Sequence, residues 1–218
     1  MKLDRASYFR VLGALTAASL FAHQSHAQPA AYPTVTDDRL EHPDAGDWLM
    51  YRRTYDGSGF SPLKQITPSN IRRLTLAWSV STDVLGAHET TPIVNHGRMF
   101  ITTPQNNIIA LDAKTGTQLW RYARKYPDGL FQPHPTNRGV ALYGDYVYTS
   151  TTDCALVALD AATGKEIWSV PLDDYKTGCY ATLAPLAVRG KIILGYSGGE
   201  LGVRGSVSDF DALTGKRI

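Results

Sequence analysis

A single carboxylate, Glu200, stands in a glycine-rich stretch of the sequence, GYSGGELGVRG, at residues 195–205. A short apolar run, residues 191–194, leads into this stretch. Glycine has no Cβ atom, so a cluster of glycines lets the backbone come close to another group. A carboxylate in such a setting needs a partner. The stretch therefore predicts a site at which some other group approaches Glu200 and the backbone beside it.

One interpretation of the stretch is a serine hydrolase, because residues 195–199 match the pattern G-x-S-x-G around Ser197. That pattern works on a sharp turn from a strand into a helix, with an acid and then a histidine following the serine. Residues 201–206 are too rich in glycine and β-branched residues to begin a helix, and no histidine follows Ser197. A dinucleotide-binding glycine loop must also open a helix. The sequence argues against both.

A short motif recurs three times along the chain: ALDAKTG from Ala110, ALDAATG from Ala158 and DFDALTG from Asp209. The step from the aspartate at 112 to that at 160 is 48 residues, and the next step, to 211, is 51. Each copy resembles a strand, a turn with glycine at a positive φ position, and a second strand. Another hairpin precedes each copy. Repeated four-stranded antiparallel units of this length predict an all-β fold, a β-propeller.

The repeats place the expected strands. We predict strands at residues 98–103, 107–111, 118–123, 139–143, 146–150, 155–159, 166–170, 184–189, 191–196 and 206–211. A tryptophan follows the motif glycine by four residues in the first two copies, as Trp120 and Trp168. A large ring at a fixed offset in each repeat is typical of packing between neighbouring blades, so we expect both rings to be mostly buried there. Helical periodicity is confined to a single capped turn near residues 67–70.

The repeat resembles the Ala-x-Asp-x-x-x-Gly-x-x-x-Trp motif of the pyrroloquinoline quinone (PQQ) dehydrogenases, the quinoprotein alcohol dehydrogenases. Further similar segments are WLMYRRTYDG from Trp48, HETTP from His88, NRGVA from Asn137, TLAP from Thr182 and SGGELGVRG from Ser197. The last segment is highly specific, whereas non-catalytic propellers share the repeat. The resemblance covers residues 45–218. It implies a PQQ-dehydrogenase β-propeller, eight-bladed in the family, of which this chain forms an incomplete N-terminal arc of about three blades.

The resemblance also implies which residues bind the cofactor PQQ and a metal, either calcium or a lanthanide. Cofactor-binding residues would be Glu89, Arg138, Thr182, Ser197, Gly198 and Gly199, and the metal ligand would be Glu200. Arg138 has the planar fork that suits a carboxylate or quinone oxygen, and carboxylate oxygens suit hard cations. Glycines at 198 and 199 would let backbone amides reach the cofactor. No residue here matches the family's catalytic aspartate, so no catalytic residue is assigned.

The implied activity is oxidation of a small alcohol, with electrons passed to a periplasmic cytochrome c. An alternative is a non-catalytic propeller of the same repeat, acting as an assembly scaffold, but it would not need Arg138, Thr182 and residues 197–200 together. The chain also departs from the family, because residues 131–136 read FQPHPT where many members carry a vicinal cysteine pair against PQQ. Since further metal ligands and the base would lie beyond Ile218, we expect the chain to be inactive alone.

The N-terminus predicts export to the periplasm. Residues 1–27 resemble a signal peptide, with a basic start, an apolar run over residues 11–22 and the cleavage site Ser25-His26-Ala27. The apolar run is shorter than the roughly 20 residues that a spanning helix needs, so we expect no stable membrane insertion. Residues 28–44 would be an N-terminal linker, and residues 45–218 the partial quinoprotein propeller domain.

Charge and cysteines limit the remaining possibilities. The chain has a formal net charge of +2, and the predicted signal peptide accounts for it with Lys2, Arg5 and Arg10 against Asp4. The rest is near neutral and has no basic run, so nucleic acid is not an expected partner. The two cysteines, Cys154 and Cys179, would lie in an oxidising compartment. They either form a disulfide or remain two buried thiols, and the sequence leaves both open.

Overall fold

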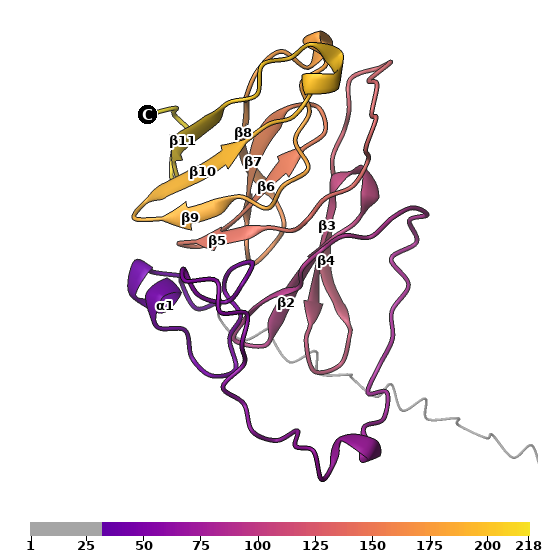
Figure 1. Cartoon of the computed structure of the whole chain (residues 1–218), viewed down its shortest axis with the longest axis vertical. Coiled ribbons are helices and arrows are strands. Elements are labelled where there is room, and N and C mark those ends of the chain that lie inside the picture. Colours follow the sequence, from indigo (N-terminus) through magenta and orange to yellow (C-terminus); the bar gives the residue numbers. More distant parts are fainter. Residues whose placement is uncertain (1–31) are drawn as a thin grey trace, which may run out of the picture. The chain divides into compact units, whose positions relative to one another are not determined.

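Three antiparallel sheets follow one another along the chain in the computed structural model, which describes residues 32–218 (Figure 1). Their strand orders are β1-β2-β3-β4, β5-β6-β7-β8 and β11-β10-β9, so each sheet is a meander whose sequential strands are neighbours. The strands are β1 (Ile93–Asn95), β2 (Arg98–Thr102), β3 (Asn107–Asp112), β4 (Gln118–Ala123), β5 (Ala141–Tyr143), β6 (Tyr146–Thr151), β7 (Ala155–Asp160), β8 (Glu166–Pro171), β9 (Leu186–Val188), β10 (Lys191–Gly195) and β11 (Val207–Asp211). The predicted signal peptide lies outside the described residues.

The predicted strands are confirmed, with small differences at their ends. The strands expected from residues 139 and 184 begin at Ala141 and Leu186, because Gly139 has φ 133° and Pro185 cannot donate a ladder hydrogen bond. The short strand β1 was not predicted, although it pairs with β2 from Ile93↔Phe100 to Asn95↔Arg98. Single helical turns are also present, as η1 (Ile71–Arg73), η2 (Pro104–Asn106), η3 (Tyr175–Thr177) and η4 (Gly199–Leu201).

The recurrent turn is held together by its own aspartate. The Asp112 Oδ1 atom accepts hydrogen bonds from the backbone N–H groups of Lys114 and Thr115, at 2.9 and 2.8 Å, and from the Thr115 hydroxyl at 3.0 Å. Asp160 and Asp211 accept the equivalent bonds from the amide and hydroxyl of a threonine in the next two sheets. In Asp112, the bond from the Thr115 amide contributes most to a lowered carboxyl pKa. These bonds explain why the motif requires aspartate and threonine at this spacing.

Tryptophan rings join each sheet to the next. A Cβ atom at Gly164, which has φ 74°, would lie 2.5 Å from the Trp120 ring, and the Trp120 indole donates to the Ala161 carbonyl at 3.1 Å. Trp168 packs on Gly215 and donates to the Leu213 carbonyl at 2.9 Å. Trp120 is 8% exposed, as expected, whereas Trp168 is only half-buried. The sheets are therefore consecutive propeller blades.

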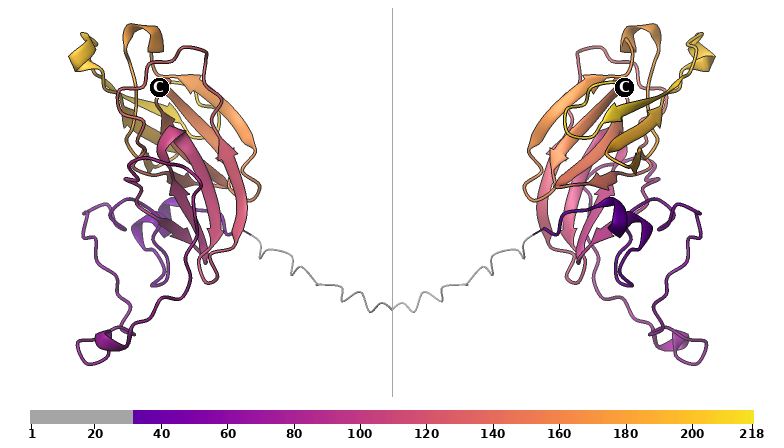
Figure 2. Two further views of the ribbon diagram at one scale, coloured as in Figure 1. Left: turned by 90° about the vertical axis from the view of Figure 1, so that its right-hand side faces the viewer. Right: turned by 90° about the vertical axis from the view of Figure 1, so that its left-hand side faces the viewer.

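A third tryptophan, Trp78, makes the same joint from a segment that is not a strand. Its ring packs on Gly116, where a Cβ would lie 2.5 Å away, and its indole donates to the Ala113 carbonyl at 3.1 Å. Trp78 thus holds blade 1 as the β4 and β8 tryptophans hold blades 2 and 3. The chain before Trp78 makes a long excursion that includes η1. This excursion runs well away from the sheets in both views of Figure 2.

Residues 28–44 were expected to be a linker. The part of this segment that the structure describes, from residue 32 on, packs on the blades. It contains the helix α1 (Asp37–Glu41), whose N-cap residue Thr36 accepts a hydrogen bond from the Arg39 amide. Val35 pairs with Gly144, and both Val35 and Leu40 are buried. Among the residues that the structure describes, no helix is long and apolar enough to cross a membrane.

The core consists of the central strands and includes a disulfide. β3 and β7 are buried along nearly their whole length, which matches their continuous apolar sequences. Cys154 and Cys179 are joined, with Cα atoms 5.6 Å apart, so the structure contains the first of the two arrangements that the sequence left open. The disulfide connects the turn between β6 and β7 to the segment that leads into blade 3.

Candidate functional site

Segments that precede the innermost strands of the three blades lie side by side. The Thr91 N–H donates to the Arg138 carbonyl at 3.2 Å, and the Arg138 N–H donates to the Thr182 carbonyl at 2.9 Å. These residues precede β1, β5 and β9, respectively. Because the blades repeat the same unit, equivalent positions meet at the same end of the inner strands. This row of backbone bonds brings together residues that are far apart in the sequence.

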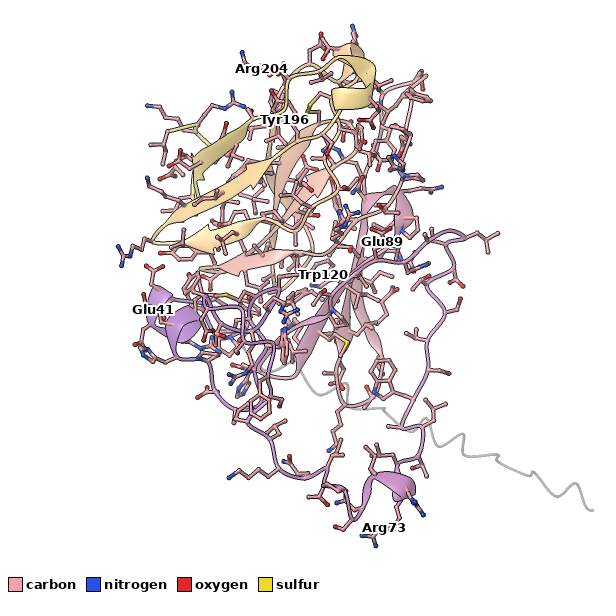
Figure 3. All side chains as sticks on the ribbon, viewed as in Figure 1. Glu41, Arg73, Glu89, Trp120, Tyr196 and Arg204 are labelled. Carbon is pink, nitrogen blue, oxygen red and sulfur yellow. A yellow bond between two sulfur atoms is a disulfide. The ribbon has the colours of Figure 1, made fainter. Side chains whose placement is uncertain are left out.

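Arg138 is the centre of the resulting side-chain group. Its guanidinium forms an ion pair with Glu89 at 3.0 Å and donates to the Thr182 hydroxyl at 2.5 Å. The Thr182 side chain belongs to a residue that is only 7% exposed, whereas the Arg138 and Glu89 side chains are 48% and 39% exposed. Figure 3 shows Glu89 beside the sheets. The group thus combines a fixed hydroxyl with a cation that can still reach a ligand.

Glu200 belongs to a second group, organised by Tyr180. The Tyr180 hydroxyl donates to the Glu200 carboxylate. Tyr180 is only 6% exposed. Burial and then the bond to Glu200 raise the Tyr180 pKa to about 12, while the Arg138 charge acts in the opposite direction. The same bond is the main cause of a lowered Glu200 pKa, and His134 adds a smaller effect. The Tyr180 hydroxyl thus holds the Glu200 carboxylate in place.

Tyr180 and His134 were not among the site residues predicted from the sequence. Tyr180 pairs with Ser197 through backbone bonds of 2.8 and 3.3 Å, so the start of the glycine-rich stretch is tied to the segment that carries Thr182. The His134 ring lies 5.9 Å from the Tyr180 ring, centroid to centroid. In the sequence, only proximity to predicted site residues could have indicated them. Tyr180 lies two residues before Thr182, and His134 lies four residues before Arg138.

The glycines around Glu200 have reasons within the chain itself. Gly198 has φ 129°, and a Cβ there would lie 2.5 Å from the Gly178 carbonyl oxygen. Gly202 has φ 83° and ends η4. Backbone packing is therefore sufficient to explain why residue 198 is glycine, without the ligand that the sequence predicted there. At Gly199, by contrast, a Cβ would face open space. Ser197 leads into a 3₁₀ turn rather than an α-helix.

Ser197 lines a hollow of about 600 Å³ beside blade 3. The lining residues are Leu183, Gly195, Tyr196, Ser197, Gly205, Ser206 and Val207. The hollow does not include the side chains of Glu89, Arg138 or Glu200. The structure thus joins Glu89, Arg138 and Thr182 directly, links Glu200 to them through Tyr180, and places Ser197 beside them through backbone pairing.

The donor chemistry fits PQQ better than it fits a metal. A half-exposed guanidinium and nearby hydroxyls suit the carboxylates of a planar polyanion. Hard cations instead take six or more oxygen ligands, and residues 32–218 contain no group of three or more histidine, cysteine, aspartate or glutamate side chains arranged to hold one. Glu200 is therefore a single donor, and the described residues do not form a metal site by themselves.

Comparisons with known proteins place the chain in a family. The family model described as glucose/ethanol/alcohol dehydrogenase, beta-propeller domain, matches residues 48–218. The quinohemoprotein alcohol dehydrogenase ADH IIB of Pseudomonas putida is 46% identical over 82% of this chain and 26% of its own length. The methanol dehydrogenase [cytochrome c] subunit 1 of Methylobacterium organophilum is 37% identical over 87% of this chain and 33% of its own length.

Solved structures agree with this assignment. The quinohemoprotein alcohol dehydrogenase ADHIIG from Pseudomonas putida HK5 matches with a TM-score of 0.80 and 40% identity, over 84% of this chain and 28% of that one. A europium-containing methanol dehydrogenase matches with a TM-score of 0.77 and 37% identity, over 84% and 32%. The chain spans about a quarter to a third of the length of these relatives. It belongs to the PQQ-dependent (quinoprotein) alcohol dehydrogenase family of oxidoreductases, as an arc of that β-propeller.

Proposed function

We propose that this chain supplies one wall of a PQQ site in an enzyme that oxidises small alcohols in the periplasm and passes electrons to a cytochrome c. The observation that carries the proposal is the Arg138 group, in which residues from the entries to three blades converge on one half-exposed cation. The name of the methanol dehydrogenase relative supports cytochrome c as the acceptor, and that of the europium-containing structure supports a lanthanide as one choice of metal.

Each residue of the Arg138 group has a distinct part. Arg138 binds a carboxylate or carbonyl oxygen of the cofactor through its free N–H groups. Thr182 fixes the orientation of the guanidinium by accepting one of its N–H bonds. Glu89 balances the charge of Arg138 while no anion is bound and holds the fork toward the site. When bound, PQQ supplies the acceptor for the hydride that leaves the alcohol.

The remaining assigned residues lie on the Tyr180 side. The position that a Cβ would take at Gly199 has no neighbouring atom within 4 Å. The Ser197 hydroxyl and the Gly198 N–H are available beside it as polar contacts, whereas the Gly198 carbonyl already accepts bonds from the N–H groups of Leu201 and Val203. Glu200, oriented by the Tyr180 hydroxyl, is the residue that would bind a calcium or lanthanide ion. Because the described residues contain no further group for such an ion, no step of the reaction is assigned to the metal here, and no catalytic base is assigned.

A binding experiment tests the proposal without requiring turnover. Purified chain is titrated with PQQ, and quenching of tryptophan fluorescence gives the dissociation constant. We expect Arg138→Ala to weaken binding at least about tenfold, since a charge-assisted pair contributes roughly 1.5–3 kcal/mol. The matched control is Arg73→Ala in η1, whose side chain lies at the far end of the excursion (Figure 3). Equal affinities for Arg138→Ala and wild type would refute the assignment.

A further inference from the structure

The Cys154–Cys179 disulfide is attached directly before the segment that carries Tyr180 and Thr182. Both cysteines are buried, with exposed fractions of 0% and 2%. Residues 173–178, which precede Cys179, are exposed or half-buried and contain only the single turn η3. Cys179 is thus the point at which the long connection between β8 and β9 returns to the interior.

The other end of the disulfide lies in the turn between β6 and β7, residues 152–154, which is firmly held. The Asn106 side-chain oxygen accepts a hydrogen bond from the Thr152 N–H at 2.9 Å, and Arg124 forms an ion pair with Asp153 at 2.7 Å. The side chains of that ion pair are only 13% and 8% exposed. Asn106 ends η2 and Arg124 directly follows β4, so both belong to blade 1. The disulfide therefore ties an exposed connection to a turn that blades 1 and 2 hold together.

The first consequence concerns Arg138. Two residues after the disulfide, the Ala181 N–H donates to the Thr151 carbonyl at 3.2 Å. The next residue, Thr182, accepts a hydrogen bond from the Arg138 N–H at 2.9 Å and another from its guanidinium. The position of Thr182, and with it the orientation of the guanidinium, therefore depends on how firmly the chain is held at Cys179.

The second consequence concerns Glu200. Tyr180 follows Cys179 directly, and its hydroxyl donates to the Glu200 carboxylate. The Tyr180 carbonyl accepts a hydrogen bond from the Ser197 N–H at 2.8 Å. A displacement of Tyr180 would therefore move both the carboxylate and the start of the glycine-rich stretch. The residues that hold both halves of the candidate site lie within three residues of the disulfide.

We propose that the Cys154–Cys179 disulfide is a positioning element of the candidate site, which fixes residues 180–182 so that Arg138 and Glu200 are oriented before a ligand binds. Without the crosslink, the connection that ends in this segment gains conformational freedom, and binding must then remove that freedom. Only molecules with the segment in place would bind PQQ, so the apparent affinity would fall with their fraction. The proposal rests on the proposed function for its ligand, whereas the ordering of residues 180–182 can be measured without one.

The test compares the oxidised full chain with two double variants, Cys154→Ala with Cys179→Ala, and Cys154→Ser with Cys179→Ser. The matched control is Gly97→Ala, which strains a left-handed turn in blade 1 and lies outside the connection. Quenching of tryptophan fluorescence gives the dissociation constant of PQQ. Backbone ¹⁵N relaxation of the ligand-free chain gives order parameters, which report motion within the folded state.

We expect both double variants to weaken PQQ binding about three- to tenfold, which corresponds to a segment in place in roughly a tenth to a third of the molecules. The order parameters of the Ala181, Thr182 and Ser197 amides should fall from about 0.85 toward about 0.6, while those of β3 stay unchanged. Gly97→Ala should match wild type in both measurements, since a general loss of stability does not loosen this segment.

Unchanged PQQ affinity in the double variants, or order parameters that stay as in wild type, would overturn the inference. Failure of both double variants to fold would also overturn it, because the disulfide would then be required by the fold as a whole. If wild type does not bind PQQ, the proposed function fails, and the order parameters alone decide whether the disulfide positions these residues.

Discussion

Arg138 shows how much of a binding residue is visible in a sequence. Its type and the motif around it suggested a carboxylate-binding role, but its partners could not be predicted from spacing. Glu89 and Thr182 come from the entries to the two neighbouring blades, 49 residues before it and 44 residues after it. Those distances become contacts only when the blades stack, because the stacking aligns the starts of their inner strands.

Tyr180 is the residue whose importance the sequence concealed. Nothing in its immediate neighbourhood marks it, since its bond to Glu200 depends on the backbone pairing of Tyr180 with Ser197. That pairing in turn follows from the path of the chain between β8 and β9. A residue that orients another through tertiary structure leaves no periodic signal, so only the structure could reveal it.

The raised pKa of Tyr180 gives a prediction for alkaline pH. A tyrosine ionises near pH 10 in the unfolded chain, and in the folded chain burial and Glu200 raise the pKa of Tyr180 to about 12. The folded state therefore keeps its proton longer, and the free energy of unfolding should fall as pH rises from 10 to 12. In Tyr180→Phe this fall should be shallower.

Urea denaturation at pH 9, 10 and 11 measures this difference. The control is Tyr51→Phe, which changes a tyrosine that is 52% exposed and should leave the pH dependence as in wild type. Parallel curves for Tyr180→Phe and Tyr51→Phe would show that the Tyr180 environment differs from the one described here.

At the scale of the element, the blade joint is the feature that the sequence predicted best. The repeated turn predicted the strands of each hairpin, and the fixed offset of the tryptophans predicted packing between blades. Trp78 was the exception, because no copy of the repeat precedes it, although it packs on Gly116 in the same way. The strand β1 was missed as well, since its three residues are too few for a clear alternation.

The joint between Trp120 and Gly164 can be tested with two glycine substitutions. Gly164 and Gly97 have similar φ values of 74° and 77°, but only at Gly164 would a Cβ meet a neighbour, the Trp120 ring at 2.5 Å. Gly97→Ala should cost about 1–2 kcal/mol of stability, from the left-handed backbone alone. Gly164→Ala should cost about 3 kcal/mol or more, because it adds a clash in a packed joint.

Denaturant unfolding of both variants gives the comparison, and the tryptophan emission maximum reports the joint. Red-shifted emission is expected for Gly164→Ala only. If Gly97→Ala and Gly164→Ala lower the free energy of unfolding equally, then packing against Trp120 is not what requires glycine at position 164.

At the scale of the whole molecule, the two ends of the inner strands β1, β5 and β9 differ in the segments that lie beside them. The candidate site lies where those strands begin, whereas the N-terminal segment crosses the hairpins where they end. Asp37 accepts bonds from the Arg189 N–H at 2.7 Å and the Tyr143 hydroxyl at 3.1 Å, and so links blades 2 and 3. The segment expected to be a linker from residue 28 thus contributes to the packing of the blades from residue 32 on.

Arg39 anchors that segment through several polar contacts. It pairs with Asp47 at 2.7 Å and donates to the Asn95 side-chain oxygen at 2.8 Å. Arg39→Ala should lower the free energy of unfolding by about 2–3 kcal/mol, because it leaves the buried Asp47 carboxylate without its cation. Thermal and urea unfolding measure the loss, and Arg72→Ala, an exposed arginine in η1, should change stability by less than about 0.5 kcal/mol. Comparable effects of the two substitutions would contradict the anchoring role.

The central claim is that the residues at the starts of the inner strands form a PQQ-binding wall. The most direct measurement is a titration of ¹⁵N-labelled chain with PQQ, followed by amide chemical shifts. We expect the largest changes at Arg138, Thr182 and residues 197–200, with no change at residues 37–41 beyond the far end of those strands. Changes confined to α1 or to the outer strands β4 and β8, with Arg138 and Thr182 unaffected, would contradict this account.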